Sequence, residues 1–179
     1  MKNVPGRKTD MKDAQWIATL LRAGLLKGSF IPDKAFRELR HLTRYRKSIV
    51  RDITAQKNRI DKFLQSSGFR FTAFLSDAFG ASGRNIIRHL MEYGNISREA
   101  LDRCLKTQTR KRIDEILIAL NGSLSEHQRG FLRMIFGHLE ALEQHRHTVE
   151  DAITKEITKH EEALSLLCSI PVSYTHLRA

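Results

Sequence analysis

The sequence predicts an all-α protein in which two long, coiled-coil-like helices flank a bundle of short helices. Apolar residues recur at spacings of three and four along almost the whole chain, which is the period of an α-helix. Two stretches sustain this pattern over several heptads, and no useful length alternates apolar and polar residues as a strand would. With 179 residues and 41% hydrophobic content, the chain is long enough to bury a core of one domain or slightly more.

A short helix is expected first, over residues 10–23. Ala14, Ile17 and Leu21 lie on one apolar stripe, and Gly24 follows where a left-handed residue would end the helix. Residues 28–32 then interrupt the helical period, and the proline at their end is suited to the first turn of the next helix.

The first long helix is expected from this proline to about residue 66, where two serines and a glycine end it. Its seam repeats at alternating spacings of three and four and has two polar interruptions. The seam consists of Leu39, Leu42, Arg46, Ile49, Ile53, Gln56, Ile60 and Phe63.

Short helices are expected between residues 72 and 123, because glycines at 80, 83, 94 and 122 break this part of the chain. Ser97 is a plausible N-cap for a helix over 98–105, and a further helix is predicted over 110–120.

A capping box of Ser125 and Gln128 opens the second long segment. Its seam runs through Ile135, Leu139, Leu142, Arg146, Val149, Ile153, Ile157, His160, Leu164 and Leu167. The two long segments suggest an antiparallel stalk with a helical tip. A seam alone leaves open whether its partner lies in the same chain or in a second copy, so dimerisation is a further expectation.

The positive charge is concentrated at one end of the chain. The first 70 residues hold 17 basic and 6 acidic residues and carry the whole net charge of +11. A one-sided cluster of this kind is typical of a surface that binds polyanions, because each neutralised phosphate releases counterions. The alternative is a solvated helix face with no ligand. We predict nucleic-acid contacts by Arg7, Lys8, Arg37, Arg40, Arg44, Arg46, Lys47, Arg51, Lys57, Arg59 and Lys62.

Asp10 and Asp13 form the one carboxylate pair whose spacing suits catalysis. Three residues apart at a helix start, they point to the same side and could share a divalent cation. The competing interpretation is structural, since acidic residues at a helix start are favoured by free N–H groups and the helix dipole.

Several classes of protein are excluded. No apolar run approaches the ~20 residues of a membrane span, and the first positions are too charged for a signal peptide. We expect a soluble, cytoplasmic protein without a membrane partner. Cys104 and Cys168 are too far apart in sequence for a C-x-x-C motif, so neither a zinc knuckle nor a disulfide framework is supported.

The N-terminal third resembles the DEDD-motif transposases of the insertion-sequence one-ten family, which is related to the Piv invertase. Residues 4–18, 20–26 and 29–32 carry this resemblance, and it continues through 37–40, 42–46 and 56–60 in the order of the family. The resemblance implies a RuvC-like ribonuclease-H domain that holds Mg²⁺ with an Asp, Glu, Asp, Asp set. Asp10 and Asp13 match the third and fourth of those acids, on the last helix of that domain.

The resemblance also implies that the first Asp and the Glu would lie upstream of Met1. Residues 1–27 would then be the end of the catalytic domain, 28–165 the helical coiled-coil region, and 166–171 the entry to a C-terminal transposase domain. Residues 172–179 depart from the family and look like translated sequencing adapter, and the nucleophilic serine expected in that domain is missing.

We therefore interpret the chain as a fragment of a bacterial DNA transposase, expected to be inactive by itself. In the intact enzyme, the family implies Mg²⁺-dependent DNA cleavage and joining, an oligomer formed through the coiled coil, and for some members a structured guide RNA. The alternative is a non-catalytic helical module for nucleic-acid binding or dimerisation, in which Asp10 and Asp13 merely cap a helix.

Overall fold

The computed structural model describes residues 10–170, except for the side chain of Gln108, and all regular structure within that range is helical. The predicted all-α class is thus confirmed. The chain divides into two units, residues 1–37 and 38–179, which are described separately. Among the described helices, none is long and apolar enough to cross a membrane.

The first unit contains helix α1 (Asp10–Arg22). The helix ends as expected, since Gly24 adopts a φ of 69° and its N–H donates to the carbonyl of Leu21 at 3.0 Å. No residue of α1 is buried.

Helix α2 (Lys34–Ser66) begins later than the sequence predicts. Pro32 is not in its first turn, because Asp33 is the capping residue: its carboxylate accepts from the N–H of Phe36 at 3.0 Å. The end is as expected, with Gly68 at a φ of 89°. Helix α7 (Glu126–Ile157) opens with the predicted capping box, in which the side chains of Ser125 and Gln128 each bond to the other's backbone N–H.

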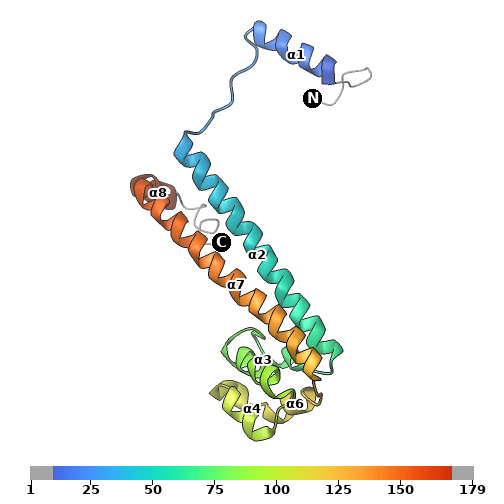
Figure 1. Cartoon of the computed structure of the whole chain (residues 1–179). Coiled ribbons are helices and arrows are strands. Elements are labelled where there is room, and N and C mark those ends of the chain that lie inside the picture. Colours follow the sequence, from blue (N-terminus) through green and yellow to red (C-terminus); the bar gives the residue numbers. More distant parts are fainter. Residues whose placement is uncertain (1–9, 171–179) are drawn as a thin grey trace. The chain divides into compact units, whose positions relative to one another are not determined.

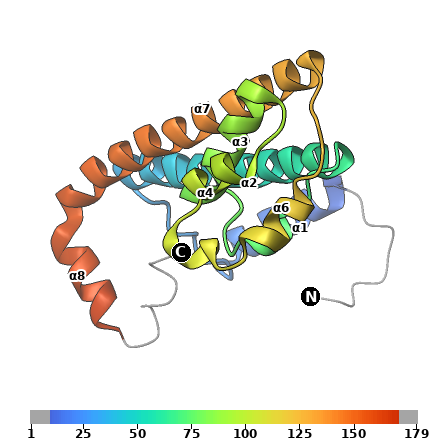
Figure 2. The same ribbon diagram turned by 90° about the horizontal axis from the view of Figure 1, so that it is seen from below.

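Helices α2 and α7 lie side by side and antiparallel within one chain (Figures 1 and 2). Phe63 meets Phe131 at 5.1 Å between ring centroids near one end, and Tyr45 meets His145 near the other. The predicted seam faces α7, with Ile49, Ile53, Gln56 and Ile60 buried. The sequence left the partner of the seam open, and the structure places it in the same chain.

The two polar interruptions of the α2 seam both find partners on α7. The amide of Gln56, with 1% of its surface exposed, donates to the carbonyl of Ile135 at 2.7 Å. The guanidinium of Arg46 donates to Glu150 at 2.9 Å. Buried polar groups are tolerated when they are satisfied in this way, and they favour one register between the helices.

The tip of the stalk is built from α3 (Ala81–Tyr93), α4 (Arg98–Cys104), α5 (Thr107–Arg110) and α6 (Ile113–Ala119), preceded by a 3-10 turn, η1 (Phe71–Phe74). Ser97 caps α4 as predicted. Phe69 and Phe71 are fully buried in the core of the tip. Between them, the backbone N–H of Arg70 donates a hydrogen bond to the carbonyl of Ala119 at 2.8 Å.

Three boundaries differ from the sequence prediction. Gly83 does not break a helix; it lies inside α3, where a Cβ would come within 1.9 Å of the Ala78 carbonyl oxygen, so the glycine permits a close backbone approach. The helix expected over 110–120 begins only at Ile113. The second seam does not continue to Leu167, because α7 ends at Ile157 and is followed by η2 (Thr158–His160) and α8 (Glu161–Ser169), which has no buried residue.

Candidate nucleic-acid interface

The outward face of α2 carries a row of basic side chains. Arg40, Arg44, Lys47 and Arg51 follow one another at spacings of four, three and four, so they lie on one side of the helix, opposite the buried seam. We call these four residues the basic stripe. At ~1.5 Å per residue the stripe is about 16 Å long, close to five phosphate steps of one DNA strand.

The basic stripe is unneutralised. All four side chains are exposed, and none forms a salt bridge with a carboxylate of residues 10–170. Lys62 lies on the same side eleven residues after Arg51 and is also exposed. Charges that are free and exposed are available to a polyanion, whereas paired ones would first have to give up a partner.

The remaining predicted contacts are placed differently. Arg46 and Lys57 face α7, where Arg46 bonds to Glu150 and Lys57 lies 4.0 Å from Glu143. Arg59 donates to the side chain of Gln56. Arg37 is exposed in the first turn of α2 and belongs to the other unit. Arg7 and Lys8 lie outside the described residues.

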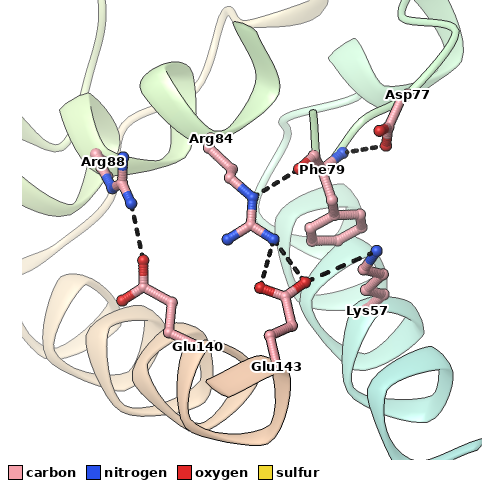
Figure 3. Close-up of polar contacts among 7 residues, drawn as sticks. All are labelled: Lys57, Asp77, Phe79, Arg84, Arg88, Glu140 and Glu143. Carbon is pink, nitrogen blue, oxygen red and sulfur yellow. Dashed lines mark hydrogen bonds and ion pairs between the residues drawn. The ribbon is translucent and has the colours of Figure 1, made fainter. Parts of the chain in front are cut away.

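A polar network holds the tip against the stalk, and Figure 3 shows it. The guanidinium of Arg84 on α3 donates to both carboxylate oxygens of Glu143 on α7, at 2.6 and 2.7 Å, and to the carbonyl of Phe79 at 2.7 Å. Lys57 of α2 approaches the same carboxylate and lies 5.5 Å from the centre of the Phe79 ring. One carboxylate thus connects three helices, and this explains why Lys57 is not part of the basic stripe.

Asp10 and Asp13 lie in the first turn of α1, Asp10 exposed and Asp13 half-buried. Two carboxylates one helical turn apart suit Mg²⁺, which is commonly held by one or two carboxylates and several waters. Among the described residues, no third His, Cys, Asp or Glu joins them to form a metal-binding group. The pair therefore fits part of a metal site and does not form a complete one.

Sequence analysis missed a hollow between α3 and α4. It has a volume of about 580 Å³, and its lining includes His89, Tyr93 and Arg103. Burial is the largest effect on the pKa of His89 and lowers it, so the imidazole is neutral near pH 7. Burial also raises the pKa of Cys104. The helical spacing of His89 and Tyr93 was the one available signal, since residues four apart share a helix face.

The comparison with protein families gives a match at the N-terminal end of the chain. Residues 1–68 match the family model of the DEDD transposases of IS110 type, which is described as a transposase. No curated protein and no solved structure matches the chain. The matched segment covers α1 and α2, and therefore contains both Asp10 and Asp13 and the basic stripe. Over residues 1–68, this chain is similar to the DEDD transposases of IS110 type.

Proposed function

We propose that the chain is the DNA-binding stalk of a transposase and that the basic stripe of α2 contacts DNA phosphates. The observation that carries this proposal is a row of four exposed cations, opposite a buried seam, that form no salt bridge within residues 10–170. The transposase match over the same segment supports DNA as the bound nucleic acid, since transposases act on DNA.

The stripe suits duplex DNA because its charges are spaced along a rigid helix. Each basic side chain that neutralises a phosphate releases a counterion, so affinity falls as salt rises. For each such contact, the logarithm of the binding constant falls by about 0.9 when the salt concentration rises tenfold. Phosphate contacts position a protein without reading sequence, so the stripe by itself provides no preference for a target site.

The test compares two variants with the same change in charge. The first carries Arg40→Gln, Arg44→Gln, Lys47→Gln and Arg51→Gln, and the control carries Arg98→Gln, Lys106→Gln, Lys111→Gln and Arg112→Gln at the tip. Duplex affinity is measured by fluorescence anisotropy across a salt series. In the stripe variant, the slope of the logarithm of the binding constant against the logarithm of the salt concentration should be smaller by about three to four, because about that many counterions are no longer released.

The control variant should keep most of its salt dependence, because its charges lie outside the stripe. Equal losses in both variants would show that net charge alone drives binding, and the stripe would then have no special role. Far-UV circular dichroism confirms that both variants remain helical.

We further propose that Asp10 and Asp13 contribute two of the ligands of a divalent cation in the intact enzyme. The cation would stabilise developing negative charge during strand cleavage, and the two carboxylates would hold it beside the DNA. Their position in the matched segment supports this role. Cleavage and joining of DNA, an oligomer and a guide RNA are predictions for the intact enzyme. The present chain has only two of the four metal-binding acids that the resemblance implies, so it should nick no DNA at any Mg²⁺ concentration.

Trp16 provides a direct readout for this pair. It is the only tryptophan of the chain and follows Asp13 by three residues, one helical turn away. Bound Tb³⁺, another hard cation, should therefore show luminescence sensitised by Trp16. Asp10→Asn and Asp13→Asn should each weaken the signal, whereas Asp33→Asn should not. A signal unchanged in both α1 variants would support the alternative, in which the two acids only cap a helix.

A further inference from the structure

The hollow at the tip lies between the C-terminal half of α3 and the residues up to the end of α4. His89, Glu92 and Tyr93 of α3 line one wall, and Arg103 of α4 lines the other. Its volume of about 580 Å³ lies within the range of small-molecule sites, which are commonly 300–1,000 Å³. Both helices belong to the same compact unit.

An aromatic surface faces this hollow. The rings of His89 and Tyr93 lie 4.6 Å apart between centroids and are tilted by 36°, so they stack on each other, and the exposed part of the Tyr93 ring is the platform left for a ligand. Tyr93 has 58% of its surface exposed, which is high for a residue whose ring ordinarily packs into a core. A neutral imidazole, favoured by the lowered pKa of His89, costs less to cover with an apolar ring than a charged one.

Groups of opposite charge also line the hollow. Arg103 is exposed and forms no salt bridge with a carboxylate in the described part of the chain. Glu92 lies beside Tyr93 and raises the pKa of its hydroxyl. A ligand that fits must offer a flat aromatic face, a donor for a carboxylate and an anionic group for a guanidinium. A nucleotide with an amino-bearing base has all three.

We propose that this hollow binds one unpaired nucleotide of a DNA strand. The base stacks on the exposed ring of Tyr93, its exocyclic amino group donates to the carboxylate of Glu92, and its phosphate contacts Arg103. This inference rests on the proposed function in so far as both require DNA, but it concerns a different surface and a different form of DNA. A paired base cannot enter, because both of its faces are covered by its neighbours in the duplex.

The proposal gives a base preference. Cytosine carries an exocyclic amino group and thymine does not, so the carboxylate of Glu92 should favour the former. Loss of one base–aromatic stack reduces affinity roughly fivefold to a hundredfold, the range measured when stacking residues are replaced.

The test uses the full chain, with single-stranded oligodeoxycytidine and oligodeoxythymidine of about twelve nucleotides and a blunt duplex of the same length. Tyr93→Leu should lose about tenfold in affinity for oligodeoxycytidine and nothing for the duplex. Tyr93→Phe should keep its affinity, because the ring remains. Since Tyr93 is mostly exposed, these variants should fold, and thermal melting confirms this.

A matched control exists on the stalk. Tyr45 is also exposed, at 51%, and also contacts a histidine, with its ring 5.6 Å from that of His145, but it does not line the hollow between α3 and α4. Tyr45→Leu should leave single-strand affinity unchanged. An adenine analogue, 2-aminopurine, placed in the strand should lose fluorescence on binding to the wild type and not to Tyr93→Leu, because its fluorescence is quenched on stacking.

Four outcomes would overturn the proposal: no loss in Tyr93→Leu, an equal loss in Tyr45→Leu, tighter binding of oligodeoxythymidine than oligodeoxycytidine, or much tighter binding of the matching RNA strand. The failure of this site and that of the proposed function are distinguishable, since duplex binding through the basic stripe is measured on the same protein. If the stripe variant binds duplex normally while Tyr93→Leu loses single strands, only the proposed function fails.

Discussion

The outward faces of α2 and α7 differ although their inward faces form one core. The outward face of α2 carries the basic stripe. Between residues 130 and 148, the corresponding row of α7 repeats at the same spacing of four and three but contains no charged residue: it consists of Gly130, Met134, Gly137, Ala141, Gln144 and Thr148. Packing cannot explain the difference, because neither row contributes to the core. The two faces therefore differ in surface charge and not in their contribution to the core.

The largest expected effect tests whether the inward faces are equivalent. Ile60 of α2 and Leu139 of α7 are both fully buried. Ile60→Ala and Leu139→Ala should each lower the free energy of unfolding by about 2–5 kcal/mol, because each leaves a cavity in the same core. Urea denaturation measures this. Met134→Ala, on the 67% exposed side chain, should change stability little. A large loss at only one of the two buried sites would mean that the helices do not share a core.

The next effect concerns charges that face inward. Arg84 and Glu143 are about one-fifth exposed and form a bidentate pair, whereas Arg88 and Glu140 are about half exposed. A double-mutant cycle with Gln at each position of the first pair should give a coupling of about 1–2 kcal/mol. The same cycle on the second pair should give about 0–1 kcal/mol, because solvent screens it. Equal couplings would show that burial does not separate these pairs.

A third prediction transfers charge from one outward face to the other. In the stripe variant, Ala141→Lys, Gln144→Lys and Thr148→Lys would place three cations in one row on α7. Duplex affinity should recover by about tenfold, or ~1.4 kcal/mol, because phosphate contacts need charge and spacing rather than a particular helix. Anisotropy at fixed salt measures it. No recovery would mean that α2 offers something besides its cations.

The smallest expected effect tests whether the outward face of α7 is free of packing contacts. Nothing lies within 4 Å of a Cβ built on Gly137, so Gly137→Ala should raise the free energy of unfolding by about 0.5–1 kcal/mol through helix propensity. Gly83→Ala, where the Cβ would strike the Ala78 carbonyl, should instead destabilise the protein. A loss of stability in Gly137→Ala would indicate that this face packs against something in solution.

Much of the fold could be predicted because local rules decided it. The capping box at Ser125, the cap at Ser97, the left-handed Gly24 and the end of α2 near Gly68 are set by a few neighbouring residues, and all are confirmed. Gly83 was predicted wrongly because its role depends on Ala78, whose carbonyl approaches through the fold of the chain. The extent of α7 was overestimated because the apolar period continues past Ile157 into α8, where no residue is buried.

The candidate site divides in the same way. Periodicity and charge were sufficient to find the basic stripe, but they also selected Arg46 and Lys57, whose partners lie about a hundred residues away in sequence. The hollow at the tip was invisible in sequence, since its walls come from two helices and its lining residues have no common motif.

By itself, the sequence determined the helical class, the seams, most helix ends and the concentration of positive charge, because each of these follows from neighbours within a few turns. Only the tertiary structure decided which helix covers each seam, which cations stay free and where aromatic rings face an open hollow. The physical reason is that solvation and pairing depend on atoms brought close by folding. A lysine or arginine is an available charge or a neutralised one according to whether a carboxylate lies within reach, as Lys47 and Lys57 show.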